Sequence, residues 1–266
     1  MKNNIVILFL FAFLGVYGQK SKTYKVEYQL NYRPDTTQIK KIKSELFTLF
    51  INDSISRFIS NQKLIKDSIA FKARFDKNLA LELIANQDKL PKSDFKFDIY
   101  KINNSQISVY ENIFFDNYFY TEEIENINNW IIKKDTTIID NFKCQKATLS
   151  FGGRNYEAWF TEEIPIKGGP YKFSNLPGLI LKIQDLKEDY IFSTINIQLY
   201  NENIVLPNNN DFTKISKIEF LKASKDRLKD LQKKVKHKII LSKKSKSYLN
   251  NRYKSFNNPI EFVAEN

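Results

Sequence analysis

The fold of this chain is decided around residues Lys167–Ile183, which read KGGPYKFSNLPGLILKI. Of the seven glycines in the chain, only Gly15 and Gly18 lie outside one short window. The glycines inside the window are Gly152, Gly153, Gly168, Gly169 and Gly178. The window also holds three prolines, at Pro165, Pro170 and Pro177. Because glycine and proline gather where a chain turns sharply, the sequence predicts several tight bends between two strands.

The segment Leu176–Leu179 fits a type II turn. In such a turn Pro177 sets φ at the second position, and Gly178 takes the positive φ of the third. Asn175 precedes the turn, and asparagine tolerates a left-handed backbone best after glycine, so a positive φ is expected there too. The alternating aliphatic residues of Leu179–Ile183 predict a strand that follows directly.

Most of the chain alternates apolar and polar residues with a period of two, as in Tyr24–Tyr32. Similar runs occur at 47–51, 95–99, 179–183 and 195–199. Residues Asn141–Glu163 predict a hairpin in which Gly152 and Gly153 supply positive φ, and Gly168, Gly169 and Pro170 are assigned a similar structural role in a turn. A sheet with one solvent-exposed face and one buried face is typically antiparallel. The predicted fold is α+β and mainly β, a curved antiparallel β-meander that includes a half-open barrel among its forms.

Two segments have helical patterns instead. Residues 63–88 are rich in alanine, leucine and oppositely charged pairs, which predicts a helical insertion. Residues Ser216–Val235 predict a basic amphipathic helix near the C-terminus that begins with a capping box of Ser216 and Glu219. Its apolar stripe consists of Ile218, Leu221, Leu228, Leu231 and Val235. We expect this stripe to lie across one face of the sheet.

The first residues have the pattern of a secretory signal peptide. Lys2 precedes the apolar run Ile5–Leu14, which is too short for a stable membrane anchor. We expect residues 1–18 to be cleaved before Gln19, leaving a single domain over 19–266 in the periplasm or cell envelope. No cysteine follows the apolar run, so a lipidated export signal is not expected.

Several chemistries lack the residues that they need. Cys144 is the only cysteine and His237 the only histidine, so neither a disulfide nor a zinc or copper site is expected, and no cofactor is implied. Cys144 lies in an alternating strand and is interpreted as a small buried hydrophobe. No nucleophile elbow or phosphate-binding loop occurs, so the chain is not expected to be an enzyme. Dispersed carboxylates such as Asp98 and Asp185 leave a carboxylate-dependent hydrolase as the less favoured alternative.

The positive charge is concentrated. Residues 214–246 hold thirteen Lys or Arg against three acids and so carry +10 of the formal net charge of +12. This segment is interpreted either as a solvated helix face or as a peripheral contact with an anionic membrane surface. Nucleic acid is not an expected partner, because the chain is expected to be exported.

The run Ala158–Asp185, AWFTEEIPIKGGPYKFSNLPGLILKIQD, closely resembles the signature of the GLPGLI family of exported bacterial proteins, known chiefly from Bacteroidota. The similarity extends upstream through Trp130 and Cys144–Ala147, and Asn258–Phe262 (NPIEF) resembles the usual family ending. Asn175 stands where the family name has its first glycine. The resemblance implies an envelope protein with no established activity.

Two interpretations of the glycine-rich loop stay open. In one, the loop presents a candidate binding site for a hydrophobic ligand. Its residues are Tyr171, Phe173, Asn175, Leu176, Pro177, Gly178 and Leu179. In the other, the loop is a structural corner that aims a core strand, with its apolar side chains packed beneath it.

The leading functional expectation is a non-enzymatic protein that binds a lipid or peptide through a concave β surface or through the 165–180 loop. The alternative is an accessory or structural partner of an outer-membrane transport receptor. A carrier should contain a sizeable apolar cavity, whereas an accessory protein should have a filled interior and an exposed apolar patch near the loop.

Overall fold

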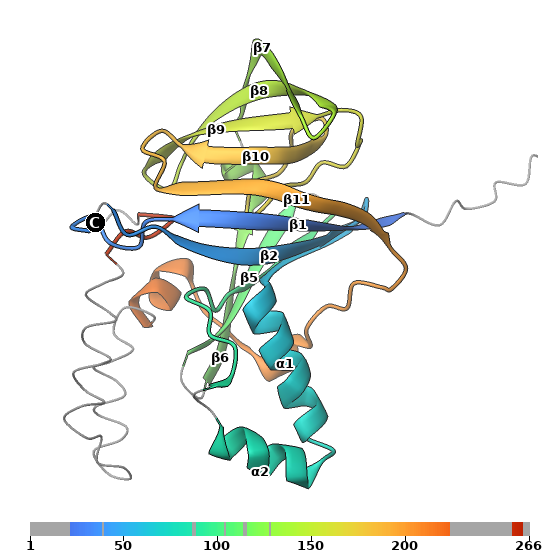
Figure 1. Ribbon diagram of the computed structural model, residues 1–266, viewed down its shortest axis with the longest axis vertical. Helices are drawn as coiled ribbons and strands as arrows, with labels where there is room; N and C mark the ends of the chain where they lie inside the picture. Colours follow the sequence, from blue (N-terminus) through green and yellow to red (C-terminus); the bar gives the residue numbers. More distant parts are fainter. Residues whose placement is uncertain are drawn as a thin grey trace, which may run out of the picture.

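Twelve strands form one open sheet in this computed structural model (Figure 1). The structure describes residues 22–262 except 39, 87–88, 104, 114–115, 128 and 224–256. The strands are β1 Thr23–Tyr32, β2 Lys43–Ile51, β3 Ile55–Ser60, β4 Asp98–Ile102, β5 Gln106–Ile113, β6 Asp116–Glu123, β7 Ile131–Ile139, β8 Phe142–Phe151, β9 Arg154–Thr161, β10 Leu179–Asp185, β11 Tyr190–Tyr200 and β12 Thr213–Lys214. The helices are α1 Asn61–Ala73, α2 Lys77–Ala85 and a helical segment at residues 217–223, with short 3-10 turns η2 Ile124–Asn126 and η3 Asn209–Asp211.

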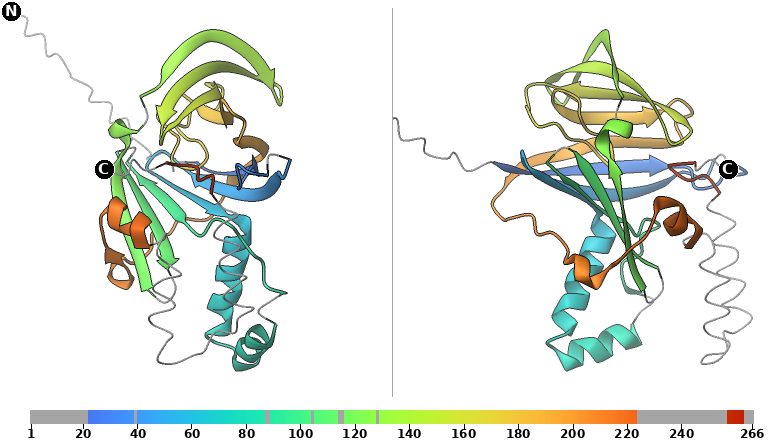
Figure 2. Two further views of the ribbon diagram at one scale, coloured as in Figure 1. Left: turned by 90° about the vertical axis from the view of Figure 1, so that its left-hand side faces the viewer. Right: turned by 180° about the vertical axis from the view of Figure 1, so that it is seen from behind.

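The sheet consists of two meanders joined by β1. Its strand order is β12-β6-β5-β4-β3-β2-β1-β11-β10-β9-β8-β7, so β1 lies between the start of one meander and the end of the other. The pairings are antiparallel except for the two-residue β12, which runs parallel to β6. Figure 2 shows the β7–β10 half arching over β1 and β2, and the sheet does not close. The predicted curved, mainly antiparallel fold is confirmed.

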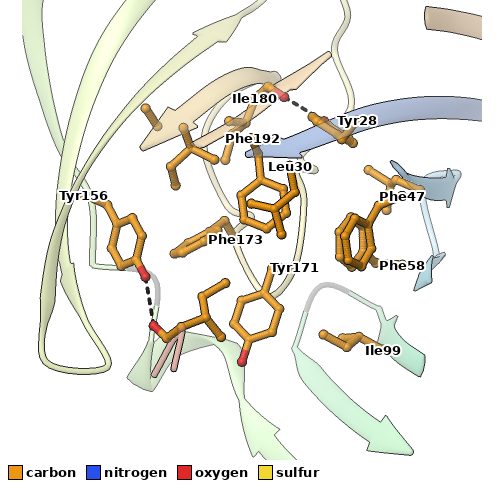
Figure 3. Close-up of a cluster of buried hydrophobic side chains, with 14 of the residues drawn as sticks. Tyr28, Leu30, Phe47, Phe58, Ile99, Tyr156, Tyr171, Phe173, Ile180 and Phe192 are labelled. Atoms are coloured by element: carbon orange, nitrogen blue, oxygen red, sulfur yellow. Dashed lines mark hydrogen bonds between the residues drawn. The ribbon is translucent and has the colours of Figure 1, made fainter. Parts of the chain in front are cut away.

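The core fills the concave side of this sheet. In β1 every second residue is buried, as the alternation predicted, and Tyr28 and Leu30 have no exposed surface. Aromatic rings from opposite strands meet there: Phe47 stacks on Phe58 with ring centroids 4.9 Å apart, and Phe192 packs edge-on against both. Figure 3 shows these rings gathered around residues of the β9–β10 loop. Burial of such large side chains supplies most of the driving force for folding.

The predicted hairpin between β8 and β9 is confirmed. Gly152 and Gly153 connect the two strands with φ of 56° and 74°. Positive φ at both central residues defines the hairpin turn whose twist matches that of the flanking strands.

The strand predicted at 95–99 is wrong in its position, because β4 begins only at Asp98. Before it, the Ser93 hydroxyl accepts from the Phe95 amide at 2.8 Å and forms a local turn. Phe95 and Phe97 both contact the ring of Phe47, at 5.4 and 6.3 Å. The alternation at Phe95 and Phe97 therefore arises from two rings that pack into the core from a turn, and the residues before Asp98 do not form a strand.

The helical insertion is confirmed as α1 and α2, which begin at caps provided by Ser60 and Asp76. The capping box of the later helix is also present: the Ser216 amide donates to Glu219 Oε2 at 2.8 Å, and the Glu219 amide donates to Ser216 Oγ at 3.2 Å. Of the predicted helix, residues 224–235 lie outside the described part of the chain, as do the signal peptide, His237 and most of the basic 214–246 segment.

The stripe predicted on that helix is partly wrong. Ile218 is 68% exposed, whereas Phe220 is buried against the ring of Tyr120 at 4.8 Å. The helix therefore rests on β6 through Phe220 rather than Ile218. Among the helices of the described ranges, none has the length and apolar character needed to cross a membrane.

Candidate functional site

The β9–β10 loop, residues 162–178, runs through the inside of the curved sheet instead of over its surface. Tyr171, Phe173 and Leu176 are buried in the core. The ring centroids of Phe173 and Tyr156 are 4.8 Å apart, and Figure 3 shows Phe173 between Tyr156 and Phe192. Among the candidate binding residues, only Asn175 and Pro177 face solvent. The packing therefore favours the structural-corner interpretation for the apolar side chains.

The bend at Pro177 differs from the predicted type II turn. The Gly178 amide donates to the Leu176 carbonyl at 2.8 Å, which closes a three-residue turn around Pro177, while the Leu179 amide bonds elsewhere, to Ile164. Gly178 has a φ of 156°, far from the third position of a type II turn. A Cβ atom on Gly178 would lie 2.0 Å from the Thr161 carbonyl oxygen. The glycine is needed because two backbone segments approach closely.

Gly168 and Gly169 are also required by close packing rather than by a turn. A Cβ on Gly168 would lie 2.2 Å from Ile51 Cδ1, and one on Gly169 would lie 2.7 Å from Ile180 Cδ1. Asn175, in contrast, has the left-handed φ of 71° that its sequence position predicted.

Tyr171 also has a positive φ, 55°, which a bulky side chain adopts at a cost of about 1–2 kcal/mol. The Phe173 amide closes the turn by donating to the Pro170 carbonyl at 3.1 Å. The Tyr171 hydroxyl donates to Glu261 Oε1. These contacts hold the strained residue in place at the centre of the molecule.

Beside Tyr171 lies a buried ion cluster, defined as Lys172, Lys217, Glu122 and Glu261. Lys172 Nζ lies 2.5 Å from Glu122 Oε2 and 2.5 Å from Glu261 Oε1. Lys217 Nζ lies 2.5 Å and 2.7 Å from the other oxygens of the same two carboxylates. The Lys172 side chain is 1% exposed and that of Lys217 is 30% exposed. Four alternating charges thus neutralise one another, as buried charges must.

The cluster keeps the Glu261 carboxylate ionised. Burial raises the pKa of Glu261, but Lys172 and Lys217 outweigh it and lower that pKa to about 2. Lys172 also donates to the Tyr120 hydroxyl at 3.0 Å. An acid fixed in its ionised form and enclosed between two ammonium groups is poorly suited to donate or accept protons. The ion cluster is therefore assigned a structural role, as an electrostatic lock that holds Glu261 of the tail against Lys172 of the loop.

Arg154 and Tyr190 also hold the tail segment, residues 257–262, against the sheet. Arg154 Nη2 donates to Asn258 Oδ1 at 2.5 Å and to the Pro259 carbonyl at 2.8 Å, while Nη1 lies 2.9 Å from Asp185 Oδ2. The Tyr190 hydroxyl donates to the Asn258 carbonyl at 2.5 Å. The NPIEF motif is therefore an integral part of the core.

The hairpin glycines also accommodate this tail. The Phe262 amide donates to the Gly152 carbonyl at 2.7 Å. A Cβ atom on Gly152 would lie 3.0 Å from Glu261 Cγ, and one on Gly153 would lie 3.1 Å from Phe262 Cβ. Three stretches singled out in the sequence, at 152–153, 168–178 and 258–262, meet at one place.

Lys101 is a second buried lysine at this loop. Its Nζ donates to the Phe173 carbonyl at 3.0 Å and to the Gly169 carbonyl at 3.5 Å. Burial lowers the pKa of Lys101 to about 7, so the amine is partly neutral near physiological pH. A lysine of this kind has nucleophilic potential, but this side chain is enclosed, and its hydrogen bonds tie β4 to the loop.

The structure does not bring the suspected carboxylates together as a catalytic pair. Asp98 pairs with Arg57 at 2.7 Å, and Asp185 pairs with Arg154. Within the described ranges no group of three or more His, Cys, Asp or Glu side chains could hold a metal ion. Cys144 is fully buried, as predicted, and burial raises the pKa of its thiol.

Two hollows lie away from the concave side of the sheet. One, of about 260 Å³, lies between Tyr110, Phe119 and Leu206 on the opposite face. The other, of about 500 Å³, lies between α1 and α2. The aromatic core itself occupies the concave side, where a carrier would hold its ligand.

The strand β7 is the most exposed apolar element of the sheet. It forms one edge, pairing with β8 alone in the strand order. Ile131, Ile132 and Ile138 are 61%, 47% and 74% exposed. Just before β7, Trp130 Nε1 donates to the Ser174 carbonyl at 2.7 Å, which ties the start of this edge to the β9–β10 loop.

Some of these features could be found in the sequence and others could not. The resemblance indicated Trp130 and Asn258–Phe262 as parts of one motif set, although not that they contact the loop. Lys101 and the four members of the ion cluster were missed, because a single charged residue in a polar sequence gives no signal of burial.

Comparison with known proteins finds a family model that matches part of the chain and solved structures that share its fold. A family model described as "Protein of unknown function (Porph_ging)" matches residues 153–182, which span β9, the β9–β10 loop and most of β10. No curated protein matches the chain. The match therefore falls on the loop whose packing is described above.

Two solved structures share the fold at low sequence identity. They are titled "Structure of PNGF-II in P21 space group" and "Structure of PNGF-II in C2 space group". Their TM-scores are 0.54 and 0.55, and their identities 15% and 14%. Each match covers 77% of this chain but only 34% or 33% of the other. The chain thus spans about a third of the length of these structures, and the likeness defines a fold found there within a larger chain.

Proposed function

We propose that this chain is an exported, non-enzymatic binding protein of the GLPGLI family, and that it recognises an extended apolar segment of a partner protein at the edge strand β7. This is the accessory role expected beside an outer-membrane receptor, stated for a particular surface. The observation that carries the proposal is that Ile131, Ile132 and Ile138 are exposed on a strand at the edge of the sheet. An exposed strand edge offers backbone amides and carbonyls to which an extended segment can add as a further strand.

The position of this edge supports the proposal. Trp130 ties the first residue of β7 to the β9–β10 loop at Ser174. The apolar patch therefore begins beside the segment that carries both the GLPGLI resemblance and the family match. A filled interior with an apolar patch near this loop is what an accessory protein requires, and what a lipid carrier lacks.

The irregular geometry of β7 limits which segments can add. The register with β8 shifts between Ile132 and Thr136, so the strand is irregular over the stretch between them, Lys133–Asp135. Bulges and edge lysines prevent indiscriminate pairing with other chains. Strand addition is consequently confined to the stretches on either side of the bulge, with Ile138 as the main side-chain anchor.

The experiment is site-specific photo-crosslinking in the cells that produce the protein. A photoreactive phenylalanine analogue at Ile138 is expected to capture a discrete partner, and the same analogue at the exposed Glu188 of the β10–β11 turn serves as the matched control. The captured species should disappear when Ile131→Lys is added, while the melting temperature stays unchanged. Capture of the same species from both positions, or of none from Ile138, would refute recognition at β7.

Export is tested independently of the partner. The protein recovered from a periplasmic fraction is expected to begin at Gln19. A chain that keeps Met1 and stays with the cytoplasmic fraction would contradict this part of the proposal.

A further inference from the structure

A helical arm projects from the sheet, and its residues serve neither the core nor the edge strand. The arm is defined as residues 61–86 and consists of α1 and α2. Figure 1 shows α1 leaving the sheet at the end of β3, with α2 lying across the far end of α1. The two helices pack on each other, and neither contains a buried residue. A nine-residue helix has little stability by itself, so its apolar surface calls for something to cover it.

The far end of the arm exposes large apolar side chains. Phe71 and Phe75 are 59% and 80% exposed, and their rings contact each other edge-on at 5.4 Å. On α2, Leu81 and Ile84 are 57% and 67% exposed, and their spacing of three residues puts them on the same side of the helix. These four exposed side chains are defined as the arm tip, and Figure 1 shows α2 and the end of α1 at the end of the molecule farthest from β7.

Lys72, Arg74 and Lys77 lie next to Phe71 and Phe75 in the sequence. Residues 61–86 contain five basic and three acidic residues. The basic ones are Lys63, Lys66, Lys72, Arg74 and Lys77. Asp67 is paired with Lys63, and Asp76 accepts from the amides of Asn78 and Leu79 as the cap of α2. Glu82 is the third acid, so the net charge of residues 61–86 is +2.

The hollow between the two helices has a similar character. It has a volume of about 500 Å³, and its apolar walls include Ile69, Leu79 and Leu83. Lys72 and Lys89 also line it, together with one carboxylate, that of Glu82. An apolar interior with ammonium groups beside it suits an acyl chain attached to an anionic phosphate group.

We propose that the arm tip docks on an anionic lipid bilayer, with Phe71 and Phe75 inserted between headgroups and the surrounding lysines and arginine on lipid phosphates. Helices that lie in the bilayer interface combine the same two features, an apolar side and flanking basic residues. Charge complementarity favours this occupant over a second copy of the chain, because two basic arms repel each other. Docking at the arm would leave β7 at the opposite end of the molecule available for a protein partner.

The test replaces Phe75 by Trp and follows its fluorescence with vesicles. Vesicles that contain phosphatidylglycerol are expected to shift the emission of F75W to shorter wavelength, and brominated acyl chains should quench it. Pure phosphatidylcholine vesicles should do neither, and salt at 0.5 M should weaken binding at least tenfold, on the order expected for screened charge. Vesicle binding without a change at position 75 would overturn the proposal, because another segment such as 214–246 would then make the contact.

Two sets of variants separate the arm from other surfaces. F71S/F75S and K72Q/R74Q/K77Q should each weaken vesicle binding about tenfold or more, whereas F75L should retain it. Ile131→Lys should leave vesicle binding unchanged while it abolishes partner capture by the probe at Ile138, so the two proposals fail separately. A dimer in sedimentation analysis that F71S/F75S dissociates would overturn the bilayer as the occupant in favour of a second copy.

Discussion

Replacing Glu261 by Gln removes one charge from the ion cluster and nearly preserves the shape of the side chain. Glu261 is 9% exposed and lies 2.5 Å from Lys172 Nζ and 2.7 Å from Lys217 Nζ. Burial raises the pKa of Glu261, but the two ammonium groups lower it from 4.5 to about 2. A pKa change of this size corresponds to about 3 kcal/mol. We expect E261Q to lose about 3 kcal/mol of unfolding free energy at pH 7.

The loss should depend on pH with a definite sign. The pKa of Glu261 is lower in the folded than in the unfolded chain, so the unfolded chain binds more protons between these values. The ionised carboxylate therefore stabilises the fold fully above about pH 4.5, and this contribution disappears as the pH falls towards about 2. The difference between the wild type and E261Q should shrink across the same window.

The assay is urea unfolding at pH 7, 4.5 and 3, followed by tryptophan fluorescence. Glu162→Gln is the matched control, because Glu162 is an exposed carboxylate in the β9–β10 loop and its replacement should change stability by less than about 0.5 kcal/mol. A value for E261Q as small as that of the control at pH 7, or a loss that does not shrink in acid, would refute the assignment of the cluster as an electrostatic lock.

Three other replacements test the remaining contacts of the loop. Gly178→Ala should lower the unfolding free energy by about 3 kcal/mol or more, because its Cβ would lie 2.0 Å from the Thr161 carbonyl oxygen. The control Asn175→Gly should change it by less than about 1 kcal/mol. Equal shifts of the two variants in thermal denaturation would contradict the close approach of the two backbone segments. Burial lowers the pKa of Lys101 to about 7, so the unfolded chain binds more protons than the folded one between pH 7 and pH 9, and the stability of the wild type should rise by about 2 kcal/mol over that range. Lys101→Met should abolish this rise. Parallel pH profiles of stability for the two proteins would contradict the lowered pKa of Lys101. Arg154→Met should lower the unfolding free energy by about 3–5 kcal/mol, because it leaves the buried Asp185 without its cation. It should also speed amide exchange in residues 258–262, which Arg154 contacts. Unchanged exchange there would show that other contacts hold the tail.

The strands could be predicted because their signals are local. The alternation in Tyr24–Tyr32 and the paired glycines at 152–153 reflect the period of a strand and the φ of a hairpin turn, which neighbouring residues determine. The positive φ of Asn175 belongs to the same class. Such features need no knowledge of distant parts of the chain.

The role of Gly178 could not be predicted correctly, because its cause is not local. The Pro-Gly pair matches a type II turn in isolation, but the Thr161 backbone passes so close that only glycine fits. Gly168 and Gly169 likewise face distant parts of the chain, but their nearest neighbours are the ends of isoleucine side chains of β2 and β10. A glycine that serves tertiary contact looks the same in sequence as one that serves a turn.

The ion cluster was invisible for a related reason. Glu122, Lys172, Lys217 and Glu261 come from four separate parts of the chain, and no local pattern indicates that they meet. Lys172 had one local sign of burial, since it stands between Tyr171 and Phe173 in a loop expected to pack beneath a bend. The exposed isoleucines of β7 were missed because alternation does not reveal which strand becomes an edge.

The most direct test of the central claim, that β7 receives a strand from a partner, is amide hydrogen exchange on the complex captured from cells. The account predicts that amides on either side of the bulge, in 131–132 and 136–139, exchange at least about tenfold more slowly in the complex than in the free protein, while those of β3 and of residues 61–86 are unchanged. Equal exchange of β7 in the free and bound protein would contradict the claim.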